Sequence, residues 1–180
     1  ETFLRIVDQI QSHSNQDLEK FWDFIERKYD NCKKPNENTF YFRVVSRCVI
    51  LHGYGEPLLD KKIVERVRVC SERNIPTYFS CVPANLTLER AKEVMDAGLT
   101  VFKFSIDALD DEWQKKIRGN QNNFEASYRT LLEIIDLKEK KGYETLLVPT
   151  MIALSEDSNS RQMHSKFMEL WKDKNVFAYV

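Results

Sequence analysis

The 180-residue sequence lacks the patterns that mark several common classes of protein. Lys and Arg total 27 against 28 Asp and Glu, so there is no basic excess of the kind that binds a nucleic-acid backbone. No apolar run reaches the roughly 18 residues that a membrane span requires, and the N-terminus has no basic-then-apolar secretory signal. We therefore expect a soluble, cytoplasmic protein, with no clear signal for a nucleic-acid or membrane partner.

Cysteine is scarce and widely spaced. The four cysteines, Cys32, Cys48, Cys70 and Cys81, form no CxxC or CxxxC pair that would bring two thiolates onto one metal from a single loop. Without a secretion signal, burial of each thiol as a small apolar group is favoured over a disulfide framework. We predict four buried thiols and no metal ligand among them.

Hydrophobic residues make up 42% of the chain, which is enough to form a core. Their spacing switches along the sequence between the period of two typical of strands and the period of 3.6 typical of helices. Short strands are predicted over 47–53, 76–82, 100–107, 144–154 and 176–180. Amphipathic helices are predicted between them, over 60–74, 86–98, 124–142 and 158–175. Because hairpin dipeptides are few, this order implies βαβ crossovers and a parallel sheet of the α/β class. Periodicity alone leaves a doubly wound sheet and a barrel both open.

The chain divides into a lead-in and a core. Residues 1–46 are predicted to be helical over 1–10 and 18–29, followed by a polar linker over 31–40 that contains Pro35. Residues 47–180 hold the βα repeats. The sequence begins without Met and closes on an apolar run, so we expect a fragment of a longer protein.

Ligands of parallel α/β proteins bind beyond the carboxyl ends of the strands, so the residues that follow each strand are the site candidates. The first predicted strand is followed by Gly53, Tyr54, Gly55, Glu56 and Pro57. Two glycines let backbone groups approach a ligand closely, and the glutamate adds an acceptor for an ammonium group. The alternative is an ordinary strand-ending turn with a solvated carboxylate at a helix start.

A second candidate group follows the third predicted strand. Ser105 and Asp107 lie two residues apart, so they point to the same face and can bind one ligand, and Arg118 follows as a partner for a carboxylate. The alternatives are that Asp107 caps the next helix, Ser105 is an interior hydroxyl and Arg118 is a surface residue. His52 is interpreted as a strand-end histidine bonded to a neighbouring carbonyl.

The order of these motifs resembles the radical S-adenosylmethionine (SAM) superfamily over residues 47–155. The resemblance rests on three segments, which in chain order are HGYGEPLLD after a strand, IPTYFSCVPANLT, and AGLTVFKFSIDALDDEWQKKIRGNQNNFEASYRTLLEI. They correspond to a GGEP-like turn, a TNG-like turn, an FSID strand end, and an IRG and aromatic pair before a long helix. The resemblance implies a partial (β/α) barrel of parallel strands.

The resemblance also implies a SAM site. The turn at 53–57 matches the motif that holds the methionine amino group, with Tyr54 as a variation on the usual glycine pair. Ser105 and Asp107 match positions that contact the SAM carboxylate or ribose. Arg118 resembles the arginine that pairs with that carboxylate.

The sequence departs from the family at two places. Ser80 and Cys81 stand where the third turn usually has Thr and Asn, so we assign no ligand role there. The CxxxCxxC loop that supplies three thiolates to a [4Fe-4S] cluster is absent from these 180 residues. The family places that loop between the first barrel strand and a helix resembling ETFLRIVDQI. We therefore expect the first strand and the cluster ligands upstream of this chain.

The function that the resemblance implies is reductive cleavage of SAM to a 5'-deoxyadenosyl radical, which removes hydrogen from a substrate. The substrate, a small molecule or a peptide, stays open, and an electron donor protein is implied. The main alternative is a non-catalytic βα module without a cluster that binds a peptide or partner protein. A barrel enzyme for a phosphorylated metabolite is disfavoured, because the glycine turn has no GxGxxG pattern and no nearby phosphate-binding Lys.

Overall fold

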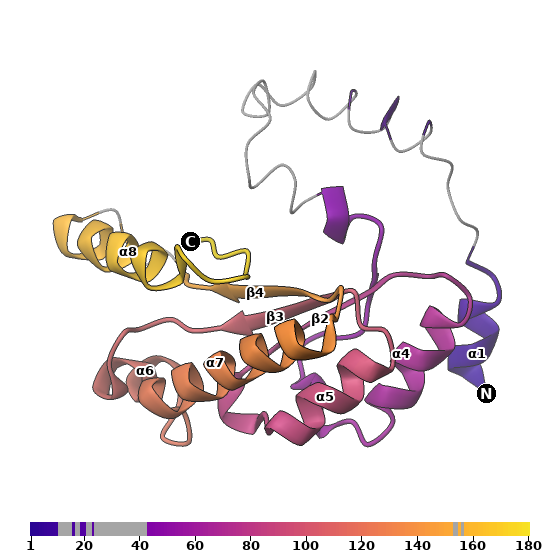
Figure 1. Cartoon of the computed structure of the whole chain (residues 1–180), viewed down its shortest axis with the longest axis horizontal. Helices are drawn as coiled ribbons and strands as arrows, with labels where there is room; N and C mark the ends of the chain where they lie inside the picture. Colours follow the sequence, from indigo (N-terminus) through magenta and orange to yellow (C-terminus); the bar gives the residue numbers. More distant parts are fainter. Residues whose placement is uncertain (11–15, 17–18, 21–22, 24–42, 153–154, 156) are drawn as a thin grey trace.

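The computed structural model describes most of the predicted core and part of the lead-in, namely residues 1–10, 16, 19–20, 23, 43–152, 155 and 157–180 (Figure 1). The predicted helix over 1–10 is present as α1 (Thr2–Val7). Most of the predicted helix over 18–29, the linker over 31–40 and Cys32 lie outside the described residues. The domain boundary after residue 46 stays a prediction.

The core is a sheet of four parallel strands in sequential order, β1 (Val49–Ile50), β2 (Thr77–Cys81), β3 (Val101–Ser105) and β4 (Leu146–Thr150). The register pairs Ser80 with Lys103 and Lys103 with Val148. A doubly wound sheet reverses its strand order, whereas this one does not among the described strands. The prediction of an α/β fold with parallel strands is confirmed, and the order is that of a barrel segment.

The fifth predicted strand, over 176–180, is reduced to an isolated parallel bridge. Thr150 pairs with Tyr179 beside β4. The backbone N–H of Phe177 donates to Leu147 and that of Tyr179 to Pro149, at 2.9 and 3.3 Å. The segment therefore continues the sheet in the predicted order without forming a full strand.

Three helices cover one face of the sheet, α4 (Ile63–Ser71), α5 (Leu88–Asp96) and α7 (Phe124–Lys141). Figure 1 shows them side by side along that face, whereas the purple segment around residues 43–48 crosses the opposite face. The remaining elements are α6 (Asp111–Arg118), α8 (Ser158–Trp171) and the 3-10 turns η2 (Pro57–Leu59) and η3 (Pro83–Asn85). No helix in the described part of the chain is long and apolar enough to cross a membrane.

Side-chain caps set where the helices begin. Thr87 accepts from the backbone N–H of Arg90 at the start of α5, as the sequence predicts. At α6 the cap is Asp110, which accepts from Trp113, so the alternative that Asp107 caps this helix is wrong. Three residues separate an N-cap from the amide that it binds, and Asp107 lies too far upstream.

The main core lies between the helices and the sheet. Phe79, Phe102 and Phe104 point to the helix side, and adjacent rings among them have centroids 4.4 to 5.0 Å apart. Because successive side chains alternate between faces, the residues between these rings face the other way. There a smaller cluster gathers around Tyr78, Val101 and Val148, flanked by Val44, Val45 and Cys48. We call this second side the inner face of the sheet.

Candidate functional site

The turn after β1 is joined to the loop after β2 by one carboxylate. Glu56 accepts from the backbone N–H of Leu58 at 3.0 Å and from that of Val82 at 2.9 Å. Pro57 starts the short helix η2, and Glu56 is its N-cap. The glutamate is half-buried, so it is not the solvated carboxylate of the alternative interpretation. It holds two loops together at the carboxyl edge of the sheet.

The glycines of this turn are not required by the fold. Gly53 and Gly55 are exposed, and neither is among the glycines with left-handed backbone. A Cβ built at either position meets no atom within 4 Å. Tyr54 between them is fully exposed. The turn therefore leaves its backbone open to the close approach of a ligand.

His52 connects β1 and β2 beyond the last backbone pairing between these two strands. Its Nδ1 accepts from the backbone N–H of Ser80 at 3.2 Å, and its ring meets the ring of Tyr78 edge-on, with centroids 5.0 Å apart. The predicted bond to a carbonyl is thus wrong, and the partner is an amide. An accepting Nδ1 places the hydrogen on Nε2. Burial and the positive charge of Lys103 lower the pKa of His52, and Glu56 opposes them.

The two serines of the inner face are close neighbours. The hydroxyls of Ser80 and Ser105 lie 3.3 Å apart, and both residues are half-buried. Ser80 received no ligand role from the sequence, yet the register places it directly beside Lys103 and within reach of Ser105. The signal that was available is the period of two along β2, which puts Tyr78 and Ser80 on one face.

Asp107 is fully buried and its carboxylate is held by the protein itself. One oxygen accepts from the Arg118 guanidinium Nε, and the other accepts from the backbone N–H of Ile152 at 3.0 Å. Gln114 accepts from the amides of Asp107 and Ala108, at 3.0 Å each. Asp107 therefore fastens the ends of β3 and β4 and orients Arg118.

Arg118 keeps part of its donor capacity. Its side chain is 26% exposed, and Asp107 occupies only Nε. In the described part of the chain, no hydrogen bond involves its two terminal nitrogens. A guanidinium in this state can still bind a carboxylate with two parallel N–H donors.

The described residues do not fit an iron–sulfur cluster. No group of three His, Cys, Asp or Glu side chains among them is arranged to hold a metal ion. Cys70 and Cys81 are buried, and burial raises the pKa of both thiols. Cys48 is half-buried, donates to the carbonyl of Val44, and has its pKa raised by burial to about 12. These thiols stay protonated near neutral pH, whereas a metal ligand is a thiolate.

The sequence model of the radical SAM superfamily matches residues 42–154, which include β1 to β4 and every candidate site residue. A search of curated proteins found no match.

Proposed function

Because the chain belongs to the radical SAM superfamily, we propose that the carboxyl edge of its sheet is the SAM-binding part of a radical SAM enzyme. The observation that carries the proposal is the turn at 53–55, where the backbone stands open and the fold itself has no need of glycine. The superfamily supplies the general chemistry, reductive cleavage of SAM followed by radical reactions.

Each candidate residue has a separate task in this proposal. Backbone carbonyls of the turn at 53–55 accept from the amino group of SAM. Glu56 holds the turn in place through Leu58 and Val82, so it is a positioning residue. Arg118 binds the carboxylate of SAM with its terminal nitrogens.

Ser105 and Asp107 complete the set from β3. Ser105 offers a hydroxyl on the inner face, beside the hydroxyl of Ser80. Asp107 acts through Arg118, because both of its oxygens are engaged within the protein. When bound, SAM supplies the sulfonium that is reduced, and the protein supplies position and exclusion of water.

The [4Fe-4S] cluster of the superfamily is not assigned to any residue of this chain. We propose that its ligands come from protein sequence outside these 180 residues, and that an electron donor protein reduces it. The absence of a three-ligand group among the described residues equally favours the alternative, a non-catalytic module for a peptide or partner protein. Binding of SAM separates the two functions, because the module has no use for it.

Titration calorimetry of SAM with the full-length protein tests the proposal. We expect Glu56→Ala to weaken SAM binding about tenfold, because the turn loses its charge-assisted bonds to the amides of Leu58 and Val82, and Ser105→Ala to have a smaller effect. Arg118→Lys keeps a cation beside Asp107 and removes the paired donors, so we expect weaker binding with unchanged thermal stability.

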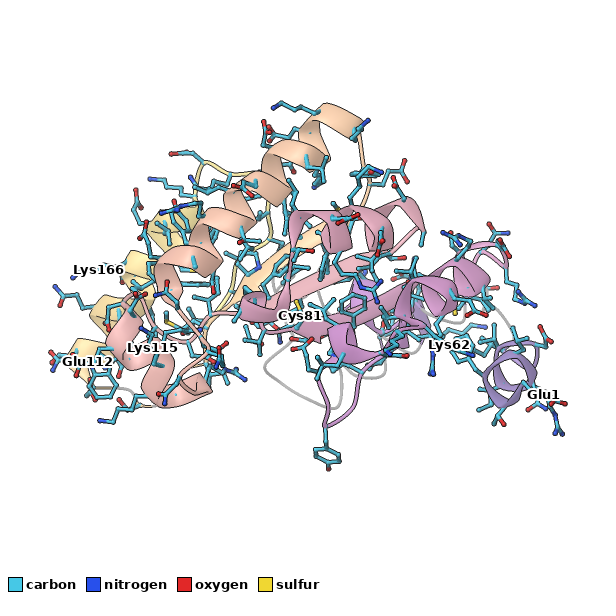
Figure 2. All side chains as sticks on the ribbon, turned by 90° about the horizontal axis from the view of Figure 1, so that it is seen from below. Glu1, Lys62, Cys81, Glu112, Lys115 and Lys166 are labelled. Atoms are coloured by element: carbon cyan, nitrogen blue, oxygen red, sulfur yellow. The ribbon has the colours of Figure 1, made fainter. Side chains whose placement is uncertain are left out.

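Lys166→Gln, an exposed change on α8, is the matched control (Figure 2). The proposal fails if the wild-type protein does not bind SAM, or if Glu56→Ala and Arg118→Lys both bind it with wild-type affinity. Thermal unfolding of each variant shows whether a loss of binding reflects a loss of fold.

A further inference from the structure

The inner face of the sheet changes character from its amino end to its carboxyl end. At the amino end lie Tyr78, Val101 and Val148, which are buried in the smaller apolar cluster. Nearer the carboxyl edge, the same face carries polar side chains, namely His52, Ser80, Lys103, Ser105, Thr150 and Tyr179. Helices α4, α5 and α7 cover the opposite face, so these polar groups do not contribute to the main core.

Lys103 is the cation of this polar set. Its ammonium nitrogen donates to the hydroxyl of Tyr179 at 3.0 Å and lies 5.3 Å from the centroid of that ring. No carboxylate of the described residues forms an ion pair with it. An ammonium group carries three N–H donors, and among the described residues Tyr179 accepts one of them. The remaining donors and the positive charge of this half-buried group can therefore bind an anionic partner.

The two carboxylates at the carboxyl edge of the sheet are engaged with other groups. Glu56 is occupied by two backbone amides, and Asp107 is paired with Arg118 and an amide. Of the other residues beside Lys103, His52 and Ser80 carry hydrogen-bond donors, whereas Val148 is apolar. His52 presents Nε2–H, because its Nδ1 is an acceptor, and Ser80 is the register partner of Lys103. This set has positive charge and donors, which complement an oxyanion.

We propose that Lys103, with His52 and Ser80, forms a binding site for an oxyanion of the substrate, a carboxylate or a phosphate. Lys103 lies two residues before Ser105 on β3, so this site is deeper on the inner face than the serine assigned to SAM. The inference rests on the proposed function in one respect, namely that the ligand is the substrate that faces SAM. The class of substrate is therefore an acidic small molecule or an acidic peptide side chain.

Titration of the full-length protein with inorganic phosphate and, separately, with succinate tests the site. We expect at least one of these anions to bind, and the one that binds more tightly identifies the preferred group. Lys103→Met and Lys103→Gln are expected to weaken binding at least about tenfold, as loss of a charged hydrogen bond does. Lys103→Arg keeps the charge and should stay within about threefold of the wild type, and the control Lys166→Gln should not differ from it.

Two outcomes overturn the proposal. Neither anion binds the wild-type protein, or both bind Lys103→Met and Lys103→Gln as tightly as the wild type. SAM affinity is measured on the same samples, and it distinguishes a failure of this site from a failure of the proposed function.

Discussion

The connection between β1 and β2 depends in part on His52 Nδ1 being free of a proton. Strand β1 has only two residues, so its ladder with β2 is short. The bond from the Ser80 amide to His52 Nδ1 extends the connection toward the carboxyl edge. Protonation of the imidazole puts a hydrogen on Nδ1, which then faces the amide hydrogen of Ser80. The connection therefore depends on a neutral ring.

This dependence predicts a loss of stability in mild acid. Burial and Lys103 hold the pKa of His52 in the folded protein below its ordinary value of 6.5. A lowered pKa means that the contribution is fully present above pH 6.5 and is lost as the pH falls through the folded value. Urea unfolding between pH 7.5 and 5 should show a steeper decline for the wild type than for His52→Asn. Parallel curves would show that this ring does not titrate with unfolding.

At the scale of elements, the surroundings of three glycines predict how much stability is lost when each is replaced by alanine. Gly98 has φ 92°, and a Cβ there would lie 2.2 Å from Ser71 Oγ and 2.8 Å from its Cβ. Gly142 ends α7 with φ 69° and open space around it. Gly53 has neither constraint. The need for glycine therefore falls in the order Gly98, Gly142, Gly53.

Each glycine is replaced by Ala and the free energy of unfolding is measured in urea. We expect Gly142→Ala to cost about 1 kcal/mol from left-handed backbone alone, and Gly98→Ala to cost more because the overlap with Ser71 is added. Gly53→Ala should change stability by less than about 0.5 kcal/mol and weaken SAM binding. Equal losses at Gly53 and Gly98 would contradict the open turn.

The elements themselves were largely predictable from the sequence, because their signals are local. The apolar period predicted β2 to β4 and the helices α4, α5, α7 and α8, and Gly142 predicted the end of α7. Strand lengths were overestimated, since pairing at β1 and at 176–180 depends on neighbouring strands. The choice of Asp110 over Asp107 as a cap depends on where the strand ends.

The candidate site was predictable only in outline. Glu56, Ser105 and Asp107 were placed at one edge of the sheet by the rule for parallel strands. The contacts of His52 with Ser80, and of Lys103 with Tyr179, join residues that are 28 and 76 positions apart in sequence, so they depend on how distant segments align in the sheet. Burial of Asp107 depends on Gln114 and Ile152, which no local pattern connects to it.

For the molecule as a whole, the rate at which a reagent labels the buried thiols reports how often the core opens. Figure 2 shows Cys81 in the middle of the molecule, and Cys70 is equally inaccessible, whereas Cys48 is half-buried. We expect iodoacetamide to modify Cys70 and Cys81 at least about 100-fold more slowly in the native chain than in urea, because reaction requires opening of the core.

Cys48 is the internal reference and should react at an intermediate rate. Peptide mass spectrometry of samples quenched at successive times assigns each rate to its residue. Rapid native labelling of Cys81 would mean that the space between the sheet and its helices is accessible, contrary to the packing described for Phe79 and Phe102.

The full exposure of Tyr54 has a consequence for how the protein survives in a cell extract. An aromatic side chain between two glycines, with no packing of its own, is the kind of loop tip at which proteases cut native chains. A ligand seated against this backbone shields the same peptide bonds. Binding of a ligand to this turn should therefore also slow proteolysis of the chain at Tyr54.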